Sequence, residues 1–380
     1  MPRRLFAFLA LILLVLPLLL TGCQASTPIP VQPGEYLPLL TPSAEGVGPQ
    51  PGLHIITDPR IELLAVIQSL SGYDQRLKLL TRENFTYKSE IKKTFSPYRD
   101  HAAVHLFDQI SSEGFSFDAP PAVMLYLSDP PELEVQTPIP DGLVARAGGP
   151  DRLGQWIDAL RSFSRDTLFM DFYEDQAVFY HALTANTSSL FSGADELALL
   201  EDYYGMRQHS YTIILAPLFH SGGFGPSLER SDGSRDIFSI IGPKSIVGLP
   251  VFGSSEDFRY LIWHEFAHAY VNPLTEEHLT QVSKYQHLYP PIQNDMQKMA
   301  YPNWEVSVNE HIVRAVTIRL AAQALGAEEG ARRLETERSQ GFRYIDLLVS
   351  GLEQYETQRG TYPSFAEFYP ELIQAFDEAE

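Results

Sequence analysis

The sequence predicts a mostly helical α+β domain with a small mixed or antiparallel sheet. Most of the chain beyond residue 52 has apolar residues at the three-and-four spacing of amphipathic helices. The clearest strand is 210–216, which is short, apolar and β-branched, and 237–241 and 122–127 are further strand candidates. Helical segments both precede and follow the strands, an order that is typical of the α+β class.

The composition is that of a globular protein with a strongly acidic surface. Of the 380 residues, 44% are hydrophobic and 20% are charged, which provides enough apolar material for a sizeable core. The net charge is -20 at pH 7. Such a surface repels the phosphates of nucleic acids, so we do not expect a nucleic acid partner.

The first 22 residues predict an export signal. Arg3 and Arg4 provide a positive start, and residues 5–20 form an almost unbroken apolar run. This run is short for a membrane span, which needs about 20 residues. We therefore assign residues 1–22 to a signal peptide. Its removal takes away Arg3 and Arg4 and changes the net charge from -20 to -22.

Cys23 is the single cysteine and directly follows this signal, so no intramolecular disulfide is possible. Residues 20–23, Leu-Thr-Gly-Cys, resemble the bacterial lipobox. This resemblance implies cleavage before Cys23 and lipid attachment to its thiol, which would hold the exported protein on a membrane, at the cell surface or the periplasmic face. Residues 23–52 are rich in proline and lack apolar periodicity, which predicts a semi-stiff tether to a domain at 53–380.

Start and stop signals place the helices of this domain in order. Asp58-Pro59 begins the first helix, and Gly72 ends it. Further helices are expected at residues 101–110, 153–163, 176–183 and 194–203. The loop between the two later strands contains His220, Gly222, Gly223 and Gly225.

A further helix is predicted over residues 255–271. Ser254 and Asp257 stand three residues apart at its start, as in a capping box. Asn272-Pro273 supplies the stop signal, because the residue before a proline disfavours the helical conformation.

This helix carries His264-Glu265-Phe266-Ala267-His268. Four residues is just over one turn, so both imidazoles project from one face and can hold one metal ion. Zinc is the natural ion for imidazole ligands in a hydrolytic site. Glu265 follows the first histidine and is placed to act as general base on water.

The segment from His264 to His268 on such a helix resembles the zincin metallopeptidases. The longer run 264–273 is similar to an uncharacterised bacterial zincin-like family, which is filed as a domain of unknown function. Residues 58–64 are similar to the opening segment of that family, and 98–101 to another of its segments. The resemblance covers most of residues 53–375. It implies a zincin-like fold with Zn2+ as cofactor, and it implies no particular substrate.

A catalytic zinc usually has three protein ligands, so a third is expected further along the chain. One zincin subclass has a histidine six residues after the second one, with a glycine between them. Here those positions are Leu274 and Val271, which excludes that subclass. Residues 304–311 resemble the glutamate helix of the gluzincins, which implies Glu310 as the third ligand, although Arg314 replaces the usual acid four residues later. The remaining alternatives are Glu305, Asp295, His278 and His287.

Hydrolysis of an amide also needs a donor for the oxyanion that forms on the attacked carbonyl. Tyr301 is the preferred candidate because it lies between the two predicted ligand segments, and the alternatives are His311, His220 and Tyr289. The strand at 210–216 is a candidate to border the cleft and hold an extended peptide by strand addition. A plain core strand is an equal alternative.

The combined prediction is a membrane-anchored zinc-dependent hydrolase, specifically a metallopeptidase that acts on a peptide or protein. His264, His268 and Glu310 would hold Zn2+, while Glu265 and Tyr301 would take part in catalysis. One alternative is a lipoprotein that binds a solute or a partner, and another is a degenerate zincin that recognises a partner without cleaving it. Metal content separates the first alternative from the leading prediction, and turnover separates the second.

Overall fold

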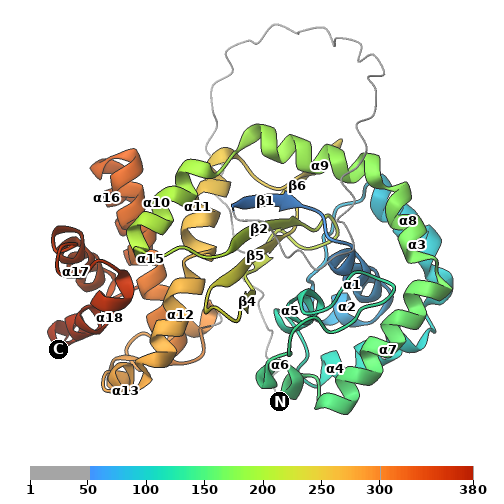
Figure 1. Cartoon of the computed structure of the whole chain (residues 1–380), viewed down its shortest axis with the longest axis horizontal. Coiled ribbons are helices and arrows are strands. Elements are labelled where there is room, and N and C mark those ends of the chain that lie inside the picture. Colours follow the sequence, from blue (N-terminus) through green and yellow to red (C-terminus); the bar gives the residue numbers. More distant parts are fainter. Residues whose placement is uncertain (1–51, 300, 380) are drawn as a thin grey trace, which may run out of the picture. The chain divides into compact units, whose positions relative to one another are not determined.

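A small mixed sheet lies at the centre of the fold (Figure 1), in a computed structural model that describes residues 52–299 and 301–379. The strand order is β1-β2-β5-β3, and β4 also pairs with β5. Strands β1, β2 and β5 run parallel to one another, whereas β3 and β4 run antiparallel to β5. The strands are β1 (Leu53–Ile56), β2 (Ser210–Leu215), β3 (Gly223–Phe224), β4 (Ser227–Glu229) and β5 (Arg235–Ile241).

The two central strands are buried on both faces, which explains why they are apolar along their whole length. Every residue of β2 is buried, and so are six of the seven residues of β5. Parallel strands covered on both faces have no solvent side that would need alternating polar residues. Tyr211 and Ile213 of β2 contact one hydrophobic core, and Ile214 contacts another.

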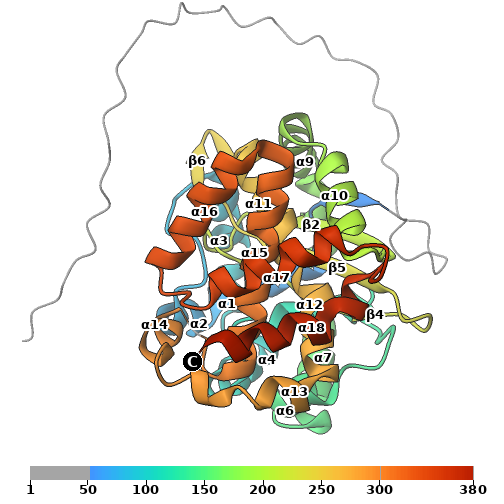
Figure 2. The ribbon, with the colours of Figure 1, turned by 90° about the vertical axis from the view of Figure 1, so that its left-hand side faces the viewer.

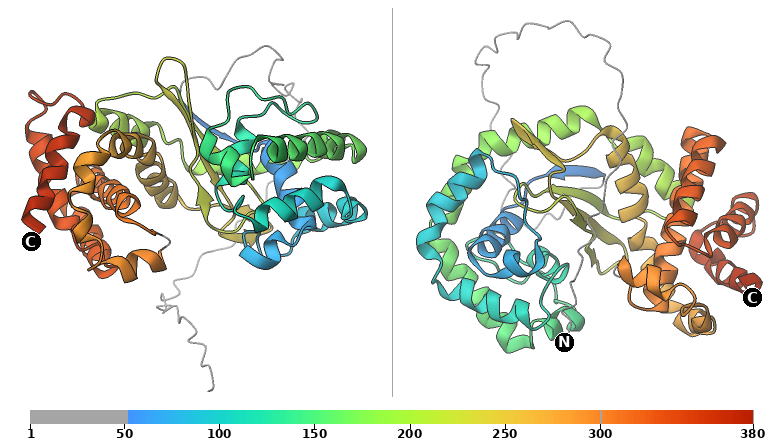
Figure 3. Two further views of the ribbon diagram at one scale, coloured as in Figure 1. Left: turned by 90° about the horizontal axis from the view of Figure 1, so that it is seen from below. Right: turned by 180° about the vertical axis from the view of Figure 1, so that it is seen from behind.

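The core on one face of the sheet is formed by helices α1 to α9, which follow β1 in the sequence (Figures 1 and 3). The last of them, α9, packs against β1 and contributes Tyr180 to this core and Leu183 to the opposite one. These helices are α1 (Pro59–Leu70), α2 (Tyr73–Leu77), α3 (Thr86–Phe95), η1 (Ser96–Tyr98), α4 (Ala102–Ser112), α5 (Ala119–Leu125), α6 (Asp141–Arg146), α7 (Pro150–Asp166), α8 (Phe169–Asp175) and α9 (Ala177–Leu190).

The core on the other face contains α10 and the helices that follow the sheet, and Figure 2 looks onto this side. The long helix α15 is central here, because it packs against α11, α12, α16 and α17. These helices are α10 (Ala194–Tyr204), α11 (Ser255–Glu265), α12 (His268–Glu277), α13 (Leu279–Ser283), η2 (Gln286–Leu288), α14 (Gln293–Lys298), α15 (Trp304–Leu325), α16 (Ala327–Ser339), α17 (Ile345–Thr357), α18 (Phe365–Gln374) and η3 (Ala375–Ala379).

Start and stop signals and apolar periodicity located five of the ten α-helices that the described residues form before β2. Asp58 caps α1, because its carboxylate accepts hydrogen bonds from the backbone N–H groups of Arg60 and Ile61. The helices predicted near residues 101–110, 153–163, 176–183 and 194–203 are confirmed as α4, α7, α9 and α10. The strands predicted at 210–216 and 237–241 are confirmed as β2 and β5.

The strand predicted at residues 122–127 is wrong, because most of this segment belongs to α5. Pro120 and Pro121 stand in the first turn of that helix, where a missing N–H group costs nothing. Every residue of α5 is buried. A short apolar run that is buried all round has no periodicity to distinguish a helix from a strand.

Two further features complete the fold. A hairpin of β6 (Ser245–Val247) and β7 (Leu249–Val251) turns at Gly248, whose φ of 75° favours glycine. Across residues 52–299 and 301–379, none of the helices has both the length and the apolar character needed to cross a membrane. The predicted signal peptide (1–22) and Cys23 lie outside the described residues, as does the tether up to residue 51.

Candidate metal centre

Helix α11 carries His264, the first histidine of the predicted motif. It packs in the hydrophobic core that contains α10 and α15, which we call the second core. Its start is fixed by a reciprocal capping box: the Ser254 hydroxyl accepts from the backbone N–H of Asp257, and the Asp257 carboxylate accepts from that of Ser254. Ile262 and Trp263 are buried against the core, while His264 and Glu265 form the C-terminal end of the helix.

The prediction of one continuous helix over residues 255–271 is wrong, because the chain forms two helices. At the junction, the Phe266 carbonyl accepts a hydrogen bond from Ala269, three residues later, and the Ala267 carbonyl is shared between Tyr270 and Val271. Helix α12 then starts at His268 and runs past Pro273 to Glu277. The predicted stop is also wrong, because Pro273 lies inside α12 and not at its end.

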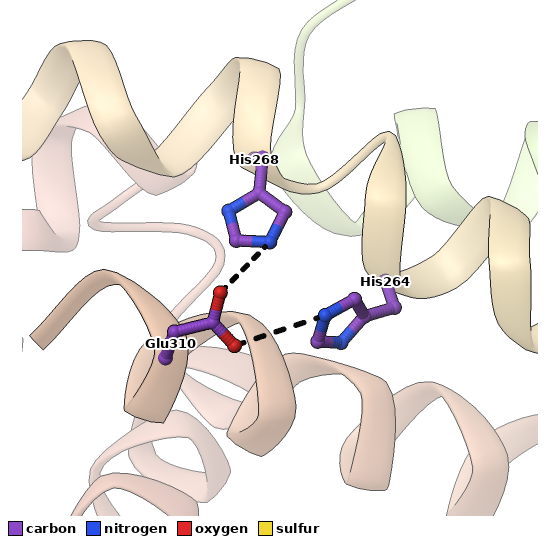
Figure 4. Close-up of side chains that lie close together, drawn as sticks. All are labelled: His264, His268 and Glu310. Carbon is purple, nitrogen blue, oxygen red and sulfur yellow. Dashed lines mark ion pairs between the residues drawn. The ribbon is translucent and has the colours of Figure 1, made fainter. Parts of the chain in front are cut away.

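Helix α15 supplies the carboxylate. Its first turn is capped by Asn303, whose side chain accepts a hydrogen bond of 2.9 Å from the backbone N–H of Val306. The Trp304 indole is anchored to the backbone of Val282, and the Thr317 hydroxyl to that of Trp263 in α11. The second contact joins α15 to α11, and α15 also packs against α12, so that the Glu310 carboxylate faces both histidines (Figure 4).

The structure brings His264, His268 and Glu310 together. The Nε2 atom of His268 lies 3.3 Å from Oε1 of Glu310, and Nε2 of His264 lies 3.8 Å from Oε2 (Figure 4). One ligand atom from each residue lies within 4.8 Å of the others. Ligands about 2.0–2.2 Å from a tetrahedral zinc are separated by roughly 3.3–3.6 Å, so small side-chain movements would complete such a site.

The protonation state of the first histidine suits a metal ligand. Burial, followed by the charges of His268 and Arg314, holds the pKa of His264 well below its usual range. A neutral imidazole keeps its lone pair available for a metal. A neighbouring side chain orients the second histidine: the Nδ1 atom of His268 lies 3.3 Å from the side-chain oxygen of Asn272, which leaves Nε2 toward the metal centre. Glu310 Oε2 is buried and has no hydrogen-bond partner among the described residues.

Glu265 is separate from this group of three. Burial raises the pKa of its carboxyl, and this rise outweighs the opposing charge of His268. Its Oε2 atom lies close to the backbone after β3, since a Cβ atom built on Gly225 would be 3.3 Å from it. Glu265 and His264 line a cavity of about 380 Å³ between α11 and the β3 side of the sheet. Other lining residues are Gly222, Gly223, Ser239, Ile241, Phe252 and Leu261.

Tyr301 and Arg314 lie beside Glu310. Arg314 Nε is 3.4 Å from Glu310 Oε2, and Arg314 Nη2 donates a hydrogen bond of 3.2 Å to the Tyr301 hydroxyl. Burial raises the pKa of Tyr301 to about 12, and the charge of Glu310 acts in the same direction. Tyr301 therefore keeps its proton at neutral pH and is available as a donor.

The three alternative candidates for the oxyanion donor, His311, Tyr289 and His220, have different surroundings. His311 is buried against the Phe342 ring, with its Nδ1 atom 2.6 Å from the backbone carbonyl of Ser307, and burial lowers its pKa to about 4. The Tyr289 hydroxyl donates to the Tyr301 carbonyl, and burial lowers the pKa of His220.

The alternatives for a third ligand do not join the cluster that the described residues form. His278 stacks on Tyr369, and Asp295 pairs with Lys298 at 2.9 Å. Sequence reasoning also missed two groups near the centre. Asn272 was detectable, because it stands four residues after His268, whereas nothing in the sequence pointed to Glu337, which accepts a hydrogen bond from Arg314.

The strand proposed to border the cleft also needs correction. The cavity beside Glu265 is not lined by β2, which is paired on both sides within the sheet. The segment around β3 lines it instead, and among residues 52–299 and 301–379 the one strand that pairs with β3 is β5. The available edge therefore belongs to the glycine-rich loop segment and not to the clearest strand.

Comparison with known proteins returned one match. Residues 53–375 match the sequence profile of a family described as a domain of unknown function, DUF4932. No curated protein and no solved structure matches the chain.

Proposed function

The chain belongs to the family described as a domain of unknown function, DUF4932, and for this member we propose the activity of a zinc-dependent hydrolase, specifically a metallopeptidase of gluzincin type. The observation that carries the proposal is the convergence of two imidazoles and one carboxylate from three helices. Two histidines and one glutamate are a common ligand set of catalytic zinc. The Glu310 carboxylate is buried and faces both imidazoles, which fits the ligand set of a divalent cation.

The chemistry divides between the metal and the residues around it. Bound zinc would supply a Lewis acid that activates water and polarises a carbonyl group. Glu265 would accept the proton of the attacking water and return it to the leaving nitrogen, and its raised pKa suits both transfers. The protonated hydroxyl of Tyr301 would donate a hydrogen bond to the oxyanion.

The cavity beside Glu265 offers room for the substrate. Its wall includes Gly222 and Gly223, and β3 is a short strand whose second side pairs with no strand in the described part of the chain. An extended peptide would add to this side through main-chain hydrogen bonds, which requires no particular peptide sequence. We therefore propose peptides or proteins as the substrate class.

A non-catalytic role is the second candidate, and one contact favours it. Glu310 already has a cationic neighbour in Arg314, so a carboxylate that only pairs with Arg314 would not need zinc. In that case the domain would recognise a partner without cleaving it. Zinc content and turnover distinguish this role from the leading proposal.

The proposed setting is the outside of a cell. The sequence of residues 1–23 supports export and lipid attachment at Cys23, followed by the proline-rich tether. The acidic composition argues against a nucleic acid partner.

The test combines metal analysis with turnover. We expect the purified full chain to contain zinc and to cleave members of a broad peptide library. Glu265→Gln should keep zinc and lose about 10²–10⁴-fold in hydrolysis, because it removes the base without removing a ligand. His264→Ala should lose both zinc and hydrolysis.

Glu276→Gln is the matched control, because Glu276 is exposed on α12 and does not line the cavity. It should retain both properties. A wild-type chain that binds no zinc would sink the proposal, and a Glu265→Gln variant with wild-type turnover would remove Glu265 from the mechanism.

A further inference from the structure

Arg314 makes contacts with three separate parts of the second core. It stands one turn after Glu310 on α15, with Nε 3.4 Å from Glu310 Oε2 and Nη2 bonded to the Tyr301 hydroxyl. Its Nη1 atom donates a hydrogen bond of 2.8 Å to Glu337 on α16. The guanidinium also lies 4.3 Å above the centre of the Phe342 ring. One side chain therefore connects the proposed ligand, the proposed donor and the neighbouring helix.

We infer that Arg314, held by Glu337, is the positioning residue of the metal centre, and this inference rests on the proposed function. Arg314 binds one carboxylate oxygen of Glu310 and leaves the other to the metal. At the same time it fixes the hydroxyl of Tyr301 on the same side of the centre.

The placement of the two oxygens of Glu310 supports this division. Oε1 lies 3.3 Å from Nε2 of His268, the spacing expected of two ligands of one ion, whereas Oε2 lies 3.4 Å from Arg314 Nε and farther, at 3.8 Å, from Nε2 of His264. Neither Oε2 nor Nε has a hydrogen-bond partner within the described residues, so the two buried atoms are complementary. Their ion pair lacks hydrogen-bond alignment, and a small rotation of the carboxylate would supply it.

Burial and charge distinguish this contact from an ordinary helix ion pair. The side chains of Arg314 and Glu310 are only 17% and 10% exposed, whereas an exposed pair four residues apart contributes little. Glu337 is 14% exposed and balances the charge of Arg314. The guanidinium therefore orients Glu310 without adding a net positive charge beside the proposed cation site. Only a rigid fork of donors can reach all three partners, which a lysine ammonium cannot do.

Helix α15 provides a matched control. Arg319 has the same 17% exposure and pairs with Glu356 through two hydrogen bonds of 2.8 and 2.7 Å. It also contacts Glu353, all on α17 and apart from the three proposed ligands. Arg314→Lys and Arg319→Lys therefore make the same change on one helix, and each keeps the positive charge.

The test measures metal binding directly, in the full chain. Zn2+ affinity is determined by competition with a chromophoric chelator, and Co2+ is used as a visible probe of coordination. Arg314→Lys should weaken Zn2+ binding about 10–100-fold, the usual effect of losing an outer partner. Its Co2+ band should also lose intensity relative to wild type, because a freed Glu310 carboxylate can bind through both oxygens and raise the coordination number. Arg319→Lys should match wild type in both measurements.

The outcomes distinguish a failure of the Arg314 inference from a failure of the proposed metal site. If Arg314→Lys matches wild type in affinity and in the Co2+ spectrum, Arg314 is not the positioning residue, although the metal site stands. If both lysine variants weaken binding equally, the effect is general destabilisation and the inference fails. If wild type binds neither ion, the proposed function fails and the inference fails with it. Should Arg314→Lys not fold, Glu337→Gln removes the support of Arg314 and is expected to weaken Zn2+ binding as well.

Discussion

At the scale of single residues, the core on the face of the sheet away from the metal centre contains a buried acid, Glu62, that pairs with no cation among the described residues. Glu62 of α1 is only 1% exposed. The Tyr87 hydroxyl donates a hydrogen bond to Glu62 Oε2, and the hydroxyls of Tyr87 and Tyr180 lie 2.7 Å apart. Glu62 Oε1 has no partner among the described residues. Burial, which outweighs the hydrogen bond from Tyr87, raises the pKa of Glu62 to about 8.

This shift gives a testable dependence of stability on pH. An acid whose pKa is raised on folding binds its proton more tightly in the native state, so the stabilisation is complete below its ordinary pKa of 4.5 and is lost as the pH rises toward about 8. We expect the free energy of unfolding of wild type to fall across this range by an amount on the order of a few kcal/mol. Glu62→Gln should flatten the decline, as measured by urea denaturation at pH 5 and pH 8. An unchanged slope in the variant would show that Glu62 is not the group responsible.

At the scale of secondary-structure elements, the start of α11 fixes where His264 lies. The capping box of Ser254 and Asp257 satisfies two backbone N–H groups that the helix itself cannot bond. Ser254→Ala should therefore lower the free energy of unfolding by about 1 kcal/mol. Chemical denaturation measures this loss. Ser283→Ala, at the exposed end of α13, is the control and should have little effect. If both variants lose the same free energy of unfolding, the capping box does not stabilise α11.

Local signals allowed some elements to be predicted and not others. Caps and periodicity act within a few residues, so the start of α11 and the positions of β2 and β5 followed from the sequence. The break between α11 and α12 did not, because Phe266 and Ala267 are ordinary helix residues that carry no stop signal. The helix α5 was mistaken for a strand for the related reason that its burial is complete.

The candidate site divides in the same way. His264, Glu265 and His268 form a local pattern, and Glu310 was selected because its surroundings resemble a known helix. Which groups surround them depends on contacts between distant helices. Glu337 is 23 residues from its partner Arg314, and no spacing rule connects them. The position of β3 at the cavity was equally inaccessible, because a two-residue strand has no sequence signature.

At the scale of the whole molecule, the proposed anchor predicts where the protein is found. Cys23 is the single cysteine, so its replacement removes the only thiol that could carry a lipid. Cys23→Ser should move the exported protein from the membrane fraction to the soluble fraction, as detected by fractionation and immunoblotting. Without acyl chains, the apolar area for anchoring is lost. If the exported variant stays in the membrane fraction, the lipoprotein assignment is wrong.

The central strand also has a consequence for the slowest motions of the protein. The amide hydrogens of β2 are covered by a core on each face and by β1 and β5 on its two edges. Solvent deuterium can reach them only when the sheet separates, which breaks both cores at once. Their rate of exchange therefore reports the free energy of complete unfolding, without any denaturant. Amides near the exposed hairpin at Val247 should instead exchange through local opening, long before the domain as a whole unfolds.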